Sequence, residues 1–361
     1  MSVTRRERFA AEEVGTAGWR LHEQRPLFDM LGDRRIGHGL LGVSDPDIFY
    51  ADGRWHMLLG AVTSRFKVAI VHARLPEGDE IDSDCWEFVT DARGRAVTLG
   101  TPTARDAWDR GGMHTPSRVI GSAHGAQVER IYYAGQRTRS TTGPRSRYAI
   151  GYLEKDASGT WRRHPSPVVE GEPDRPSALE PFVLFTGGRW RMWYLSAEGE
   201  VGRGEQPDYQ MRYTESSDGV RWQPPEVFAS TAEGYFDNCV VPVVDGWRMV
   251  LARGTNLHGT RPFPSQGLWI CESTSDPAGR DTWHPVARLL DTDLESEPWF
   301  SAGLCGPAIV TDSDLMHVFA TGTAGPTSWW RELRARVRDH RRLPPPSPFY
   351  LCTGRLTFTR H

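Results

Sequence analysis

A repeated pair of short strands decides the fold, and its clearest copy is LEPFVLFTGGRWRM at residues 179–192. The same pattern occurs 135 residues earlier as SDPDIFYADGRWHM at 44–57, and 57 residues later as FDNCVVPVVDGWRM at 236–249. Each copy joins two runs rich in β-branched and aromatic residues through a turn with glycine, which is typical of a β-hairpin. The chain is therefore built from internal repeats.

Two further copies complete the series, because the segments 115–120 and 306–310 also begin with a small residue and proline. The repeat anchors fall at positions 46, 116, 181, 238 and 307. In the outer half of four units a turn leads into a tryptophan, at positions 86, 161, 222 and 283. Radially repeated four-stranded units are typical of β-propellers. The sequence thus predicts an all-β fold, a five-bladed β-propeller with four-stranded antiparallel blades around a central funnel.

The repeat also sets the expected domain boundaries. Residues 18–361 are predicted to form a single propeller, with blades starting near 44, 114, 179, 236 and 305. Closing the ring requires strands from both chain ends in one blade, and segments 19–28 and 349–358 are the candidates. Residues 1–17 are charged and are expected to form a loosely held N-terminal arm.

Three acidic residues occupy the same position of the repeat. Superposing the Trp-x-Met triplets of the three clear copies aligns Asp45, Glu180 and Asp237. Equivalent positions in a ring of repeats converge on one axis, so the sequence predicts one pocket with three carboxylates. The competing interpretation is that each acid only caps a turn at the head of its blade.

Composition argues against several functional classes. A net charge of −3 and a pI of about 6.5 do not favour binding to nucleic acid or to an anionic membrane. The sequence has no GxSxG, GxxxxGKS/T or HExxH motif, so we expect no cofactor, and no metal-ligand set is recognisable. The partner is then a small molecule or an oligosaccharide. No pattern indicates an oligomeric state.

Localisation follows from the cysteines and the N-terminus. The five cysteines are scattered without CxxC spacing, which indicates reduced thiols. The first residues lack the apolar run of a signal peptide, and no run of eighteen apolar residues occurs. We therefore expect a cytoplasmic protein.

The Asp-Pro pair at the first head, the acids at later heads and the SDGVRW turn at 217–222 together resemble a known group. The chain is similar to the five-bladed propeller glycosidases of glycoside hydrolase families 43 and 32. The resemblance implies that Asp45 is the base or nucleophile. Glu180 then takes the place of an orienting Asp, and Asp237 that of the general-acid Glu, so these two residue types are exchanged relative to the family. The resemblance also allows a structural cation on the propeller axis.

Seven other residues are candidates for contacts with substrate. His114, at the head of the second unit, would bind hydroxyl groups or share a proton with an acid, unless it is a structural turn residue. Asp47 follows Asp45 by two positions on the same strand face, and is otherwise a solvated turn acid. The remaining candidates are three arginines that would grip an anionic group or else lie on the surface, and two tryptophans expected at the pocket mouth: Arg118, Arg137, Arg253, Trp108 and Trp299.

These observations predict a glycoside hydrolase-like enzyme that uses three carboxylates for acid/base catalysis on a glycoside or related polyol. In this hypothesis Asp45 is the base, Asp237 the acid, and Glu180 tunes and orients, with the last two roles open to reversal. One alternative is a non-hydrolytic acid/base enzyme of intracellular specialised metabolism that carries out an elimination, isomerisation or cyclisation. Another is a non-catalytic carbohydrate-binding propeller. Two acids that face each other across a sugar-sized gap favour hydrolysis, and a funnel narrowed by aromatic residues favours the non-hydrolytic enzyme. Acids that point apart favour binding only.

Overall fold

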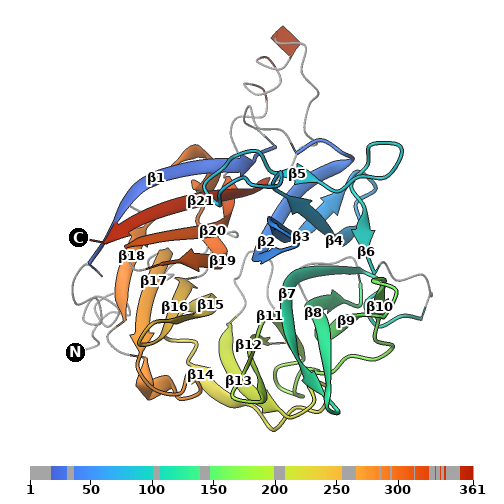
Figure 1. The fold of residues 1–361 in the computed structure, drawn as a ribbon, viewed down its shortest axis with the longest axis vertical. Coiled ribbons are helices and arrows are strands. Elements are labelled where there is room, and N and C mark those ends of the chain that lie inside the picture. The colour runs from blue at the N-terminus through green and yellow to red at the C-terminus, as the bar shows by residue number, and fades with distance from the viewer. Residues whose placement is uncertain are drawn as a thin grey trace.

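Antiparallel strands are the main secondary structure of the computed structural model (Figure 1). The structure describes residues 18–30, 36–100, 106–138, 147–198, 208–253, 266–283, 286–292, 295–312, 314–324, 330, 334, 337–338 and 350–360. The expected N-terminal arm, residues 1–17, lies outside this part of the chain. Within it, no helix has the length and apolar character needed to cross a membrane.

Three sheets have four strands each. The first runs in chain order through β11 (Ser177–Thr186), β12 (Arg189–Ala197), β13 (Gln210–Ser216) and β14 (Glu226–Ala229). The second also runs in chain order, through β15 (Tyr235–Val243), β16 (Gly246–Arg253), β17 (Gly267–Ser273) and β18 (Ala287–Asp291). The third joins the two ends of the chain in the order β1 (Trp19–Phe28), β21 (Tyr350–Arg360), β20 (Leu315–Ala324) and β19 (Leu304–Thr311).

The fourth sheet has nine strands and contains two antiparallel runs. One run is β2 (Leu40–Ala51), β3 (Arg54–Thr63) and β4 (Val68–Arg74), with the short β5 (Glu87–Phe88) and β6 (Thr98–Leu99) on β4. The other is β7 (Gly112–Ala123), β8 (Ala126–Gln136), β9 (Tyr148–Lys155) and β10 (Trp161–Arg163). A single parallel pair, Val68 with Gly112, connects them. Two 3-10 turns complete the described elements, η1 (Arg280–Thr282) and η2 (Pro298–Phe300).

The sheets surround a common centre (Figure 1). The inner strands β2, β7, β11, β15 and β19 contact one another in this order, and β19 also contacts β2. The strands that begin at the five predicted heads therefore meet around one axis. The number of blades stays a prediction, because β2–β4 and β7–β10 belong to one hydrogen-bonded sheet and not to two separate ones.

Burial on both faces explains why the middle strands of the sheets are continuous runs of apolar residues in the sequence. In β8, Ile131, Tyr132, Tyr133 and Ala134 are all fully buried. A strand with side chains covered on both faces has no polar face, so its hydrophobic residues are consecutive. Packing of sheet against sheet thus accounts for the aromatic-rich hairpins of the repeat.

A buried basic residue recurs at one position of the second strand in every repeat: His56, Arg130, Arg191, Arg248 and His317. Among them, Arg130 shows how such a residue ties neighbouring sheets together. Its guanidinium donates to Glu154 at 2.8 Å and to the carbonyl of Asp218, in the next sheet's turn, at 2.7 Å. It also lies 4.9 Å from the ring centroid of Trp190.

Replacing this arginine should destabilise the fold. We expect Arg130→Met to lower the free energy of unfolding by about 1–3 kcal/mol, because a partly buried carbonyl and a carboxylate lose their charged donor. The matched control is Arg162→Met, whose exposed ion pair with Asp156 is screened by solvent and should change stability much less. Denaturant unfolding measures both. Equal effects for the two variants would contradict the role given to Arg130.

Candidate active site

The heads of the inner strands share an irregular backbone. The pairing register shifts between Ser44 and Asp47 in β2, between Leu179 and Phe182 in β11, and at matching points of β7 and β19. The residue before proline has a positive φ at each of these heads: Asp45 (53°), Thr115 (51°), Glu180 (52°) and Gly306 (56°). Such a φ costs an L-residue roughly 1–2 kcal/mol. Strain of this kind gathers at functional sites.

The fourth head differs because Asn238 replaces proline. The register shift in β15 lies between Tyr235 and Asp237, so Asp237 itself pairs with Ala252 across the strands. Its carboxylate still accepts a hydrogen bond from the backbone N–H of Gly306 in β19 at 2.8 Å. Asp237 thus reaches the axis from a backbone that is not bulged at that residue.

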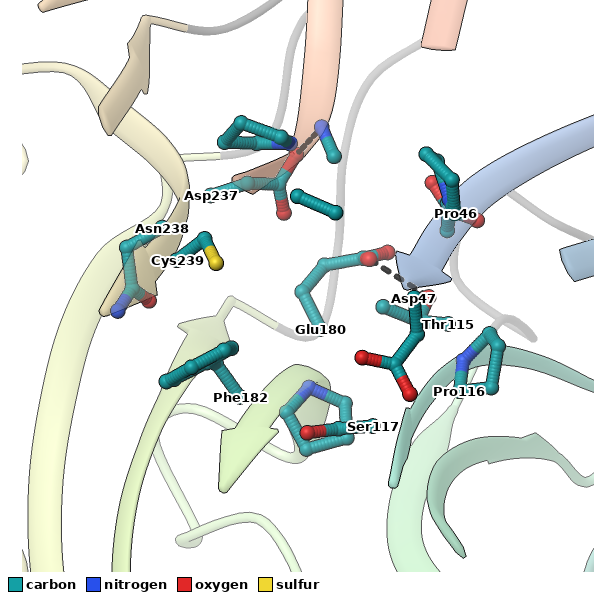
Figure 2. Close-up of a pocket in the computed structure, with 15 residues that line it drawn as sticks. Pro46, Asp47, Thr115, Pro116, Ser117, Glu180, Phe182, Asp237, Asn238 and Cys239 are labelled. Carbon is teal, nitrogen blue, oxygen red and sulfur yellow. Dashed lines mark hydrogen bonds between the residues drawn. The ribbon is translucent and has the colours of Figure 1, made fainter. Parts of the chain in front are cut away.

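Three consecutive residues from each inner strand line an axial cavity of about 40 Å³ (Figure 2): 45–47, 115–117, 180–182, 237–239 and 306–308. Space of this size holds a few water molecules. The cavity brings together the predicted acids Asp45, Glu180 and Asp237. Phe182 is the one aromatic residue among those that line it.

Asp45 is the acid with the most hydroxyl neighbours. The Ser44 hydroxyl donates to its Oδ2 at 2.8 Å, and the Thr321 Oγ1 lies 3.4 Å from its Oδ1 and accepts its backbone N–H at 2.6 Å. Burial raises the pKa of Asp45, and these hydroxyl contacts oppose the rise. A Cβ on Gly306 would approach Asp45 Oδ1 to 2.9 Å, so glycine at this position leaves room for the carboxylate.

Glu180 and Asp237 hold protons more tightly than free carboxyls. Burial and the charges of Asp45 and Asp237 raise the pKa of Glu180 well above its usual range, against one hydrogen bond from Thr115. Burial and the charge of Asp45 likewise raise the pKa of Asp237 well above its usual range. Like charges this close cannot all be ionised together. The cluster therefore retains at least one proton near neutral pH.

His114 lies beside this cluster. Its Nδ1 is 2.7 Å from the Thr115 hydroxyl and 3.8 Å from Glu180 Oε1, and its ring meets Tyr148 edge-on at 5.3 Å. Burial lowers the pKa of His114 to about 4, so the ring is neutral at physiological pH. These contacts bring His114 to the acids, whereas its binding of substrate stays a prediction.

Comparisons with known proteins place this geometry in context. No protein family profile matches the chain. The structure of BT0996 in complex with RGII superposes with a TM-score of 0.62 at 12% identity, covering 99% of this chain and 96% of that one. The catalytic domain of the Coprinopsis cinerea GH62 α-L-arabinofuranosidase superposes with a TM-score of 0.56 at 13% identity, covering 94% of this chain and 96% of that one. The GH43_1 enzyme from Xanthomonas citri complexed with xylose superposes with a TM-score of 0.53 at 13% identity, covering 96% of this chain and 90% of that one.

The chain has the fold of the propeller glycoside hydrolases. The resemblance that the sequence indicates is confirmed at the level of the fold. In sequence, the chain is similar to two uncharacterised proteins of Mycobacterium tuberculosis, at 32% identity over 211 residues and 32% over 127 residues. These matches cover 55% and 34% of this chain, and 63% and 40% of the relatives' own lengths.

Asp47 is a further carboxyl on the first inner strand of this propeller. It lines the cavity and accepts a hydrogen bond from the backbone N–H of Arg118 at 2.7 Å. Burial raises the pKa of Asp47 to about 7. The interpretation of Asp47 as a solvated turn acid is therefore wrong, and it is a second carboxyl of β2 in the cavity wall.

The three arginines are not among the residues that line the cavity. Arg118 is ion-paired with Glu129 at 2.6 Å and lies 3.9 Å from the ring centroid of Phe49. Arg253 is buried against aromatic rings, 4.4 Å from the centroid of Trp269, and is not the surface residue that the sequence favours. Arg137 is exposed just after β8. The structure therefore does not support the prediction that one of these arginines binds an anionic group at the axis.

The two tryptophans expected at the pocket mouth pack inside the sheets instead. Trp299 is 4% exposed and covers Gly322 and Gly354, where an added Cβ would meet its ring at 2.3 and 2.6 Å. Trp108 stacks on Tyr133 and covers Gly135 and Gly151 in the same way. Each indole fills the space left by glycines on the second and third strands of its unit. Their role is therefore a repeated packing contact.

Several site residues escaped the sequence patterns. Thr115 and Thr321 contact the carboxylates, yet threonine in a strand gives no signal beyond β propensity. Tyr209 precedes β13, outside the aligned hairpins, and the charges of Glu180 and Asp237 add to burial in raising the pKa of its phenol. The sequence patterns do not identify Tyr209, because it lies far from the repeat motif along the chain.

The spacing of Asp45, His114 and Glu180 is also that of a possible metal site, because each offers an atom within 4.8 Å of the others. However, the Nδ1 of His114 and the Oε2 of Glu180 are already bonded to Thr115. Two of the three side chains, His114 and Glu180, are thus already joined through the Thr115 hydroxyl. This arrangement fits a proton network better than a metal centre.

Proposed function

We propose that this chain is a glycosidase-like hydrolase with a five-bladed propeller, whose axial carboxylates Asp45, Glu180 and Asp237 act on a glycoside or related polyol. The observation that carries the proposal is the convergence on one cavity of three carboxyls, of which Asp237 is buried and Asp45 and Glu180 are partly buried. Glycoside hydrolysis needs one protonated and one ionised carboxyl that flank the scissile bond. Acids that face one cavity favour hydrolysis over simple binding.

Within this proposal Asp45 is the base, since its hydroxyl donors favour its ionised form. Asp45 and Glu180 offer atoms within 4.8 Å of each other, so the charge of Asp45 acts on Glu180 at short range. In this proposal Glu180 tunes the protonation of its neighbours. Asp237, whose pKa is raised by burial and by Asp45, then donates the proton to the leaving oxygen.

An aryl glycoside panel tests the proposal. The solved structures with this fold include an α-L-arabinofuranosidase, an enzyme complexed with xylose and a β-fructofuranosidase. The panel therefore contains the α-L-arabinofuranoside, the β-D-xyloside and the β-D-fructoside. We expect wild-type protein to release the aryl group from at least one member. No release from any member would turn the assignment toward the non-hydrolytic alternative.

The leaving group of the substrate can be used to distinguish the general acid from the residue that only tunes its neighbours. An alkyl glycoside needs protonation of its leaving oxygen far more than an aryl glycoside does. We expect Asp237→Asn to lose more activity on the alkyl than on the aryl substrate, whereas Glu180→Gln loses similar activity on both. The reverse pattern would exchange the two roles. Rates of both variants on one matched substrate pair provide the measurement.

A further inference from the structure

A continuous chain of hydrogen bonds leads away from the carboxylates. The Thr115 hydroxyl lies 2.6 Å from Glu180 Oε2 and 2.7 Å from His114 Nδ1. Thr115 is held there by a positive φ of 51°, which is a costly conformation for a β-branched residue. The strained backbone thus places one hydroxyl between an acid and an imidazole.

One hydroxyl proton allows two arrangements of this chain. In the first, His114 Nδ1–H donates to Thr115, and Thr115 donates to an ionised Glu180. In the second, a protonated Glu180 donates to Thr115, and Thr115 donates to a bare Nδ1 while the imidazole carries its proton on Nε2. The two arrangements differ by one proton on Glu180 and by the tautomer of His114.

The far end of this hydrogen-bond chain is a ring nitrogen without a partner. His114 Nε2 is buried and has no hydrogen-bond partner in the structure. A buried nitrogen without a partner carries a desolvation cost, and polar groups left this way call for an explanation. Because the ring is neutral at physiological pH, Nε2 can take up a proton only as another leaves through Nδ1.

We propose that Thr115 and His114 are positioning residues that pass protons to and from Glu180. A hydronium ion that reaches Nε2 gives it a proton and leaves as water, the Nδ1 proton moves to the Thr115 oxygen, and the Thr115 proton moves to Glu180 Oε2. The imidazole remains neutral and changes tautomer, and the only net change is one proton gained by Glu180. This inference rests on the proposed function, in which Asp237 loses a proton to the leaving group and the cluster must regain one.

Other groups face this chain from neighbouring strands. Asp45 on β2 and Asp237 on β15 act on Glu180 through their charges, and both oppose its ionisation. Tyr148 on β9 faces the imidazole edge-on, and Tyr209 lies near Glu180. The protonation of Glu180 is therefore coupled to that of both neighbouring acids.

A measurement of the His114 tautomer without substrate tests this proton relay, the passage of protons through His114 and Thr115 to Glu180. Protein labelled with ¹⁵N only in histidine is titrated between pH 4 and pH 10, and the His114 signals are identified by their loss in His114→Gln. We expect the Nδ1 and Nε2 resonances of His114 to exchange protonated character as Glu180 ionises. Glu180→Gln should fix one tautomer at every pH. Thr115→Val should uncouple the ring from Glu180, whereas Thr115→Ser should restore the wild-type change.

The outcomes separate the relay from the hydrolase proposal. A single His114 tautomer across the titration in wild type, or an unchanged switch in Thr115→Val, would overturn the relay. If Thr115→Val does not fold, Thr115→Ala removes the same hydroxyl with less bulk at the strained position. A tautomer switch together with an inactive glycoside panel would keep the relay and discard only the proposed substrate class.

Discussion

Asp45→Asn should abolish most of the glycoside turnover, with kcat/KM lower by about 100- to 10,000-fold. Asparagine keeps the shape of the side chain and can still accept from the Ser44 hydroxyl, but it cannot take a proton from water. The φ of 53° at this position is also tolerated by asparagine better than by most residues. The loss should therefore appear in the rate and not in folding.

The matched control is Asp52→Asn, at the turn of the same hairpin. Asp52 is exposed, has a similar φ of 49° and does not line the cavity. We expect it to retain wild-type kcat/KM and the wild-type melting temperature. Full turnover by Asp45→Asn on the best panel substrate would remove Asp45 from the mechanism. Comparable losses in both variants would show that the effect is not specific to the axial carboxylate.

The sequence predicts the inner part of this molecule well because the repeat constrains it. Trp-x-Met triplets at constant positions in hairpins identify which residues begin each inner strand. From that register the convergence of Asp45, Glu180 and Asp237 follows without coordinates. The structure adds the bulges and the positive φ values at the heads, which a two-residue strand period does not reveal.

Residues outside the repeat could not be placed in this way. Trp299 looked like a pocket residue because it interrupts the pattern, yet the glycines that it covers lie 23 and 55 positions later in the chain. Only folding brings an indole and its glycines together. Arg253 looked like a surface residue because arginine usually is, and aromatic rings from other strands bury it. Long-range packing decides both cases.

The carboxylate cluster implies a conflict between stability and activity. Each buried acid prefers its neutral form, so ionising it at neutral pH weakens the folded state. A protein gains no stability from charges gathered in a small cavity, and such sites persist where function needs them. Asp47 allows this cost to be measured apart from the three proposed catalytic acids, because burial alone dominates its shift and its pKa is raised to about 7.

Asp47→Asn should therefore stabilise the protein at alkaline pH. Because the folded state binds the Asp47 proton more tightly than the unfolded chain, the contribution of Asp47 to stability falls as pH rises from about 4 to about 7. A shift from 3.8 to about 7 corresponds to at most about 4 kcal/mol above pH 7. The asparagine oxygen can still accept from the Arg118 backbone N–H, so little is lost in exchange.

Melting temperatures of wild type, Asp47→Asn and Asp52→Asn between pH 4 and pH 9 measure this effect. The Asp47→Asn curve should lie above wild type at pH 8 and meet it near pH 4, while Asp52→Asn follows wild type throughout. The difference between variant and wild type isolates Asp47, since both proteins keep the other buried acids. A stabilisation that does not change with pH would mean that packing, and not the buried charge, distinguishes aspartate from asparagine at this position.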